Sequence, residues 1–311
     1  ITNVKTSGTI TAGAITIPNT DGSANQVLKT DGSGTLSWTA NSGSGASYID
    51  GLSDGLVEDN SVYIGNDPSS TTSTAENNVA VGVDSLQANT TGAGNTAVGK
   101  DALLANTTAS NNVAIGLDAL TANTTGNSNT AVGFVALDAN TTASSNTAIG
   151  AYALSANTTG ASNVAVGRGA LLVNSTAANN TAVGYQAGVA LTTGTQNTLM
   201  GRSAGAALTT GIQNIYIGTY AGDESDDSHR NVAIGYAALS ANAGDSNIAI
   251  GNYALDAIGT NAQTGLIAIG HNALTALTSG AQNTSVGYQS SLALVDGDAN
   301  TAIGWYAMKS G

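Results

Sequence analysis

The chain of 311 residues lacks several residue types that common protein classes require. It has no cysteine, which excludes disulfide bonds and zinc sites with thiolate ligands. With 2 histidines and 2 prolines, it has little material for a histidine metal cluster, a histidine-based triad or a collagen helix. Charged residues make up 9% of the chain and aromatic residues 4%, whereas soluble domains are about one quarter charged. This is not the composition of an ordinary globular enzyme.

Basic residues are especially scarce, with 7 Lys and Arg against 20 Asp and Glu and a net charge of -13. A nucleic-acid-binding protein needs a basic surface, so this class is excluded, and an anionic membrane surface is a poor partner for the same reason. No run of 18 apolar residues occurs, so we expect no membrane-spanning helix. The start of the chain has neither an initiator Met nor the pattern of a signal peptide, and we expect a fragment or a processed product.

What the chain has in abundance is glycine, 40 residues in all, and many of these glycines end the repeated motif Asn-x-Ala-(Val/Ile)-Gly. We call these residues the anchor glycines. Of the 14 intervals between them, 12 are 17 residues long, one is 16 and one is 19. The anchor glycines are Gly65, Gly82, Gly99, Gly116, Gly133, Gly150, Gly167, Gly184, Gly201, Gly218, Gly235, Gly251, Gly270, Gly287 and Gly304.

A period of 17 residues is too short for helix-pair repeats, which need about 33 residues. It suits one coil of a β-solenoid with two short strands and two tight corners, because Val, Ile and Thr favour strands whereas Gly and Asn favour corners. The sequence therefore predicts an all-β fold, a parallel β-solenoid of about 15 coils. At about 4.8 Å per coil, the rod would be roughly 70 Å long.

Two positions after each anchor glycine indicate a packed interior. Most repeats have Leu four residues after the glycine, as at Leu103, and Asn seven residues after it, as at Asn106. In two repeats the Leu becomes Gly, and the later Asn then becomes Leu, as at Gly188 and Leu191. Such a volume exchange is typical of a close-packed core. The Asn residues that precede each strand, such as Asn95, are expected to stack as an amide ladder at a corner.

The Ala residue within each strand suggests a contact surface. Residues such as Ala80, Ala97 and Ala114 would form a flat face of small side chains. A thin solenoid cannot bury such a face alone, so we expect this face to contact other copies of the chain in an oligomer.

The sequence divides into three parts: residues 1–47 as an N-terminal β-hairpin and connector segment, 48–65 as a lead-in and first degenerate coil, and 66–311 as solenoid repeats. In the first part, 9–11 and 14–17 are expected to form short strands. A turn follows at 18–22. Residues 27–30 and 35–38 are expected to pair as a hairpin, followed by a linker at 41–45.

The repeat Asn-Thr-Ala-Val-Gly, followed by Ala-Leu and Asn-Thr-Thr-Gly, resembles the head repeats of trimeric autotransporter adhesins. It resembles still more closely the related repeats of marine bacteriophage tail fibres, as do residues 15–22, 26–32 and 56–65. The resemblance implies a left-handed β-roll that assembles as a trimer and serves surface attachment. Adhesin heads usually have shorter repeats with Ser in place of Ala-Leu, which favours the phage branch. The self-cleaving chaperone that often ends such fibres does not follow the last repeat, so we expect a truncated or processed end.

Nine of the 13 aromatic residues follow an anchor glycine by one or two positions. They are expected to line one corner of the solenoid, as a receptor-contact or glycan-contact stripe or as packing at the corner or between protomers. They are Phe134, Tyr152, Tyr185, Tyr220, Tyr236, Tyr253, Tyr288, Trp305 and Tyr306.

The remaining candidates are weaker. The acidic run with Asp223, Glu224, Asp226 and Asp227 is a possible Ca²⁺ site, but it lacks the EF-hand spacing and is expected to be a solvated corner. His271 lies at a corner position and is expected to be exposed and inert. Repeated Thr pairs such as 107–108 raise the alternative of an ice-binding solenoid.

An enzyme is not expected, because glycoside hydrolysis needs paired carboxylates in a cleft and the acidic residues here are scattered over corners. We predict no catalytic residues, no resident metal and no cofactor. The expected function is a structural and adhesive fibre segment, a homotrimeric phage tail fibre that presents a host-receptor-binding surface. The alternative is the head of a bacterial surface trimeric autotransporter adhesin. Expected partners are the chain itself, a host surface receptor or glycan and, through the N-terminal segment, other virion tail proteins. The expected location is the virion or, for an adhesin, the bacterial outer surface, with no nucleic acid bound and no membrane insertion.

Overall fold

The computed structural model describes residues 10–12, 15–17, 26–31, 33, 35–40, 55–58, 61–64, 75–241, 244–256 and 263–308. The chain divides into two compact units, Ile1–Leu56 and Val57–Gly311. The described elements are all strands and turns, so no described helix could cross a membrane. The predicted all-β class is confirmed.

The first unit contains two antiparallel hairpins. In the first, β1 (Ile10–Ala12) pairs with β2 (Ile15–Ile17), and in the second, β3 (Gln26–Thr30) pairs with β4 (Leu36–Ala40). The pKa of Asp31, in the turn between β3 and β4, is lowered first by a hydrogen bond with the Ser33 side chain and then by the backbone N–H groups of Ser33 and Thr35, which donate to its carboxylate. The strands predicted from sequence are confirmed, whereas the turn at 18–22 and the linker at 41–45 lie outside the described residues.

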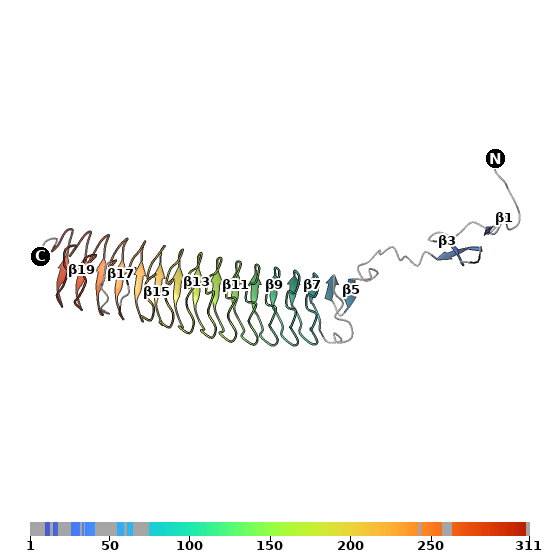
Figure 1. Ribbon diagram of the computed structural model, residues 1–311, viewed down its shortest axis with the longest axis horizontal. Coiled ribbons are helices and arrows are strands. Elements are labelled where there is room, and N and C mark those ends of the chain that lie inside the picture. Colours follow the sequence, from blue (N-terminus) through green and yellow to red (C-terminus); the bar gives the residue numbers. More distant parts are fainter. Residues whose placement is uncertain are drawn as a thin grey trace, which may run out of the picture. The chain divides into compact units, whose positions relative to one another are not determined.

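The second unit is dominated by one sheet of 16 strands in chain order, from β5 to β20. Its strands are β5 (Gly55–Glu58), β6 (Ser61–Ile64), β7 (Val79–Val81), β8 (Thr96–Val98), β9 (Val113–Ile115), β10 (Thr130–Val132), β11 (Thr147–Ile149), β12 (Val164–Val166), β13 (Thr181–Val183), β14 (Thr198–Met200), β15 (Ile215–Ile217), β16 (Val232–Ile234), β17 (Ile248–Ile250), β18 (Ile267–Ile269), β19 (Thr284–Val286) and β20 (Thr301–Ile303). From β7 onward each coil contributes one strand, and Figure 1 shows these strands side by side along the stack of coils.

From β6 to β20, neighbouring strands are parallel and in register, so that equivalent residues of successive coils lie side by side. In β10 and β11, for example, Thr130 pairs with Thr147 and Ala131 pairs with Ala148. The same register continues from β6 to β20, and 13 turns separate β7 from β20. The predicted parallel β-solenoid with a repeat of about 17 residues is therefore confirmed.

We call the segment that follows the anchor glycine in each coil the second arm. It differs from the prediction, because it is a series of turns rather than a strand. Asp101 and Leu103 both have left-handed backbone, with φ of 58° and 53°. Some of the arm's N–H groups bond within the turn, as from Asn106 to the Leu103 carbonyl. Others bond to a neighbouring coil, as from Leu103 to the Ala119 carbonyl. The expectation of two strands per coil was wrong, although the second arm still ties neighbouring coils together.

The anchor glycines mark the corner between the strand and this second arm. Every one from Gly82 to Gly304 has a φ between 130° and 142°, a backbone region that residues with a Cβ rarely adopt. A Cβ built on Gly150 would lie 2.7 Å from the carbonyl carbon and oxygen of Gly167 in the next coil. Close stacking of the backbone at this corner therefore requires glycine.

The interior is filled by three kinds of small or medium side chains. Where the central residue of a strand is Ala, it is buried, and so is the Leu four residues after the anchor glycine, as at Ala148 and Leu154. The Ala face proposed for contacts between copies, represented by Ala80, Ala97 and Ala114, therefore lies in the core, and that prediction was wrong. Because residues alternate along a strand, it is the residues on either side of Ala that face outward.

Two ladders of buried asparagine satisfy the backbone inside the solenoid. In the first, the Asn78 side-chain oxygen accepts the backbone N–H of Asn95 at 2.8 Å, and the pattern repeats from coil to coil. In the second, the Asn106 amide donates to the side-chain oxygen of Asn89 at 2.9 Å. The predicted ladder exists, but its amides lie in the interior, and it mainly joins amide oxygens to backbone N–H groups.

The exchange of Leu for Gly is confirmed as a feature of core packing. Leu191 is buried, and a Cβ on Gly188 would lie 2.6 Å from a methyl carbon of Leu199. Leu199 and, one coil later, Tyr216 occupy the position where other strands have Ala, and both are completely buried. A larger side chain on the strand and a missing one on the second arm therefore compensate each other.

Candidate functional site

Two exposed surfaces of the solenoid are candidates for binding. The first is the outer face of the sheet, formed by the first and third residues of each strand from β7 to β20. The first residue is always Thr, Val or Ile, and the third is always Val, Ile or Met, so no charged residue interrupts this face.

Many apolar side chains of the outer face are exposed. Ile115 and Ile149 are each 40% exposed, and Ile303 on the last strand is 71% exposed. Soluble monomers rarely expose a continuous apolar patch of this kind, and larger patches mark contact surfaces. The outer face is therefore a candidate surface for contact with another protein.

The second surface is the aromatic corner, which lies directly after the anchor glycines. The nine aromatic residues chosen from sequence all lie here, and most are 36% to 44% exposed, with Trp305 at 74%. Residues two positions after the glycine have left-handed backbone, as Tyr152 does with a φ of 60°. This conformation is common to the coils, so it does not depend on the aromatic side chain.

From Tyr220 to the end of the stack, the rings form one continuous series. Ring centroids are 6.0 Å apart between Tyr220 and Tyr236 and 5.3 Å apart between Tyr236 and Tyr253. The series continues through His271, Tyr288 and Tyr306 with separations of 5.4 to 6.3 Å. Phe134 and Tyr152 form a separate pair at 5.2 Å.

The offset from the anchor glycine determines how neighbouring rings meet. His271 and Tyr288 both follow their glycines by one position, and their planes are stacked at 15°. Where one ring is at the first position and its neighbour at the second, the planes meet edge to face, as between Tyr220 and Tyr236 at 85°. The corner is therefore an ordered surface of ring faces and ring edges.

Three further residues contact the aromatic stripe that were not predicted as part of it. His271 is exposed as expected, but it links the ring series rather than standing apart from it. Arg168 lies 5.9 Å from the centre of the Tyr185 ring, and Arg202 lies 5.3 Å from the centre of the Tyr220 ring. All three occupy the first position after an anchor glycine, a signal that a search limited to aromatic residues overlooks.

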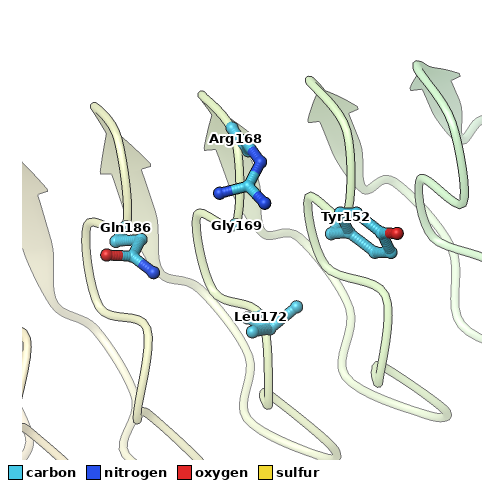
Figure 2. Close-up of a pocket in the computed structure, with 5 residues that line it drawn as sticks. All are labelled: Tyr152, Arg168, Gly169, Leu172 and Gln186. Atoms are coloured by element: carbon cyan, nitrogen blue, oxygen red, sulfur yellow. The ribbon is translucent and has the colours of Figure 1, made fainter.

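A groove of about 400 Å³ interrupts the corner where Gly169 takes the place of a larger residue. Its lining residues are Tyr152, Arg168, Gly169, Leu172 and Gln186, which Figure 2 shows on successive coils. The groove thus combines an aromatic ring, a cation and an amide in one place.

The acidic run does not gather into a metal site in the described part of the chain, where no three His, Asp or Glu residues could hold an ion together. Burial raises the pKa of Asp223 to about 6, with further contributions from Glu224 and Asp256. One Asp223 carboxylate oxygen is buried with no hydrogen-bond partner in the described structure, whereas Asp226 and Asp227 are exposed. Arg230 forms an ion pair with Asp245 of the next coil at 3.0 Å rather than with this run.

The first Thr of each pair serves the contacts between coils. The hydroxyl of Thr107 donates to the carbonyl of Thr124 at 3.1 Å, and Thr124 repeats the bond with Thr141. These side chains are half-buried, whereas the second Thr of each pair, as at Thr108 and Thr125, is exposed. The ice-binding alternative stays a prediction.

No family model, curated protein or solved structure matches this chain.

Proposed function

We propose that this chain is a structural and adhesive fibre segment, a homotrimeric phage tail fibre in which the solenoid is a stiff rod. The observation that carries the proposal is the uncharged, apolar outer face, which a single chain leaves in water along the whole stack from β7 to β20. Packing this face against other copies would remove it from water, and closed symmetric assembly is the usual form of such contacts. The number three comes from the resemblance of the repeats.

The dimensions support an extended contact. The 13 intervals between β7 and β20, at about 4.8 Å each, give a face about 60 Å long. A narrow apolar strip of this length suits coaxial packing of identical rods better than contact with a small partner. Three rods in parallel would also be stiffer than one, which is what a fibre needs.

The aromatic corner is the proposed contact with the host surface. Tyr and Trp combine large apolar area with a polar group, so they are common in surfaces that bind sugars or proteins. A tail fibre would present the continuous ring series from Tyr220 to Trp305 outward along the rod. The mechanism is mechanical: the rod holds this surface away from the particle until it meets a receptor.

The double variant Tyr236→Ser/Tyr253→Ser tests the receptor contact. We expect at least tenfold weaker binding of the purified chain to host cells, with unchanged mass in solution and an unchanged far-UV circular dichroism spectrum. The control Val173→Ser removes an exposed apolar side chain that lies on the second arm. Loss of the oligomer in the double variant would instead identify the corner as packing between protomers and would contradict its role as receptor contact.

A further inference from the structure

The groove at Gly169 exists because one side chain is missing from the corner, although the backbone does not require glycine there. Gly169 has a φ of 65°, and the equivalent residues Tyr152 and Gln186 have φ values of 60° and 53°. A Cβ on Gly169 would have a single neighbour within 4 Å, the Cγ of Gln186 at 3.6 Å, which is an ordinary contact. The anchor glycines from Gly82 to Gly287 differ, since a Cβ there would collide with the backbone of the next coil. The glycine therefore leaves an open space that the fold does not demand.

The walls of this space present three different chemistries. The Tyr152 ring forms one wall and is held edge to face against Phe134. The side chain of Gln186 forms the opposite wall, one coil beyond Gly169, and offers an amide donor and acceptor. Leu172 adds an apolar contact from the second arm.

Arg168 gives the groove a cation that the protein does not neutralise. Within the described part of the solenoid, Lys100 pairs with Asp101 and Arg230 pairs with Asp245, whereas Arg168 has no carboxylate within 4.0 Å. Its guanidinium instead lies over the Tyr185 ring and donates a weak hydrogen bond of 3.4 Å to the Tyr185 hydroxyl. An exposed arginine held in this way keeps most of its N–H donors available.

We propose that the Gly169 groove binds a carboxylated sugar, such as a uronic acid or a sialic acid. The guanidinium of Arg168 pairs with the sugar carboxylate in a bidentate geometry, the contact that arginine favours. The Tyr152 ring covers the apolar C–H face of the sugar ring, and the Gln186 amide bonds to a hydroxyl. A volume of about 400 Å³ lies within the range of small-molecule sites, about 300–1,000 Å³.

The inference rests on the proposed adhesive function and specifies one ligand for it. Saturation-transfer NMR and calorimetry on the full chain would compare methyl β-glucuronide and N-acetylneuraminic acid with neutral methyl β-glucoside. We expect at least one acidic sugar to bind at least fivefold more tightly than the neutral one. The two acidic probes distinguish a uronic acid from a sialic acid.

Filling the groove is the decisive variant. Gly169→Gln introduces the side chain that the next coil already has and should weaken binding of the acidic sugar at least tenfold. The matched control is Gly265→Gln, because Gly265 has a φ of 69° and its Cβ would lie 3.8 Å from the Cγ of Gln282, yet it is remote from the groove. Arg168→Gln should remove the preference for the acidic sugar to within about twofold, while weak neutral binding persists.

Three outcomes would overturn the proposal: equal binding of acidic and neutral sugars, unchanged binding by Gly169→Gln, or a smaller oligomer in Gly169→Gln. The last result would mean that a second copy occupies the groove. A chain that forms trimers but binds no acidic sugar would refute the groove and leave the fibre function intact. A chain that stays monomeric would refute the fibre function whatever it binds.

Discussion

The interior of the solenoid and the outward side of its strands differ in whether their side chains are buried and hydrogen-bonded. On the inward side, Ala, Leu and Asn are completely buried, and the asparagine amides bond from coil to coil. On the outward side, Thr, Val, Ile and Met remain partly exposed with no partner surface. One chain therefore buries its interior side chains but leaves its apolar outer face in water, as expected of one subunit of a larger assembly.

The largest effect is expected from a truncation on the inward side. Leu137→Ala would leave a cavity next to the second arm and lower the free energy of unfolding by about 3 kcal/mol. The left-handed backbone at Leu137 does not prevent the test, since Ala237 adopts a φ of 47° in the same protein. Thermal unfolding at fixed protein concentration would measure the change. A loss below about 1 kcal/mol would mean that the inward side is loosely packed.

The first asparagine ladder gives the next largest effect. The Asn129 side chain accepts the backbone N–H of Asn146 at 3.0 Å and donates to the Ala143 carbonyl at 2.9 Å. Asn129→Ala leaves the buried backbone N–H of Asn146 unpaired and removes one of the two amide donors to the Ala143 carbonyl, to which Asn140 also donates, so it should cost about 2 kcal/mol in denaturant unfolding. Ser128→Ala, at the exposed neighbouring residue, is the control and should change little. Equal effects of the two variants would contradict a structural role for the ladder.

Substitutions on the outward side should affect assembly rather than the stability of the single chain. Ile115→Asp/Ile149→Asp places two charges on the outer face and should change the unfolding free energy of the chain itself by only about 0.5 kcal/mol, as for most surface substitutions. It should nevertheless convert the oligomer to single chains, measured by light scattering. Val173→Asp, exposed on the second arm, should leave the oligomer intact. If both variants keep the oligomer, the outer face is not its contact surface.

A pH-dependent effect concerns Asp223, one of the buried polar groups in the described structure that has no hydrogen-bond partner. Its pKa is raised to about 6 from 3.8, chiefly by burial, so the folded chain holds the proton more tightly than the unfolded chain. Stability should therefore fall as the pH rises from about 4 to 6, and the full penalty is present above pH 6.

Asp223→Asn removes this penalty and should be more stable than the native chain at pH 7.5 by roughly 1 kcal/mol, after allowance for solvent screening. At pH 4 the two should be equal. Asp227→Asn, at an exposed residue, should show no such pH dependence. If the native chain instead became more stable relative to Asp223→Asn as the pH rises from 4 to 6, the raised pKa of Asp223 would be contradicted.

The sequence predicted the architecture because the repeat constrains it strongly. The 17-residue period, the anchor glycines and the exchange at Gly188 and Leu191 indicated a stacked and packed solenoid, and the structure agrees. The nature of the second arm was missed because left-handed Leu residues, such as Leu103, have no signature in residue propensity.

The side of the strand that faces inward was also missed, because alternation separates Ala from its neighbours without showing which of them is buried. A usable signal was present: Tyr216 replaces the Ala in the coil where Gly222 replaces the Leu, and a Cβ on Gly222 would lie 2.5 Å from the Tyr216 ring. Two positions that exchange volume in this way must both face the interior, which places the Ala position of the strand in the core.

The aromatic corner shows the same limit at the level of the candidate site. Its nine aromatic members were found from their distance to the anchor glycines, whereas the ring contacts of Arg168 and His271 at equivalent positions were not predicted. The groove could not be predicted, because it depends on the absence of a side chain at Gly169 and on the space between coils. Position in the repeat was therefore a better guide to this surface than residue type.

The mass of the purified chain in solution tests most directly the claim that the outer face is covered by other copies. Sedimentation equilibrium at micromolar concentration should give three times 30.3 kDa for the native chain. A single species of 30.3 kDa at the same concentration would contradict the account, because the outer face would then be stable in water without a partner.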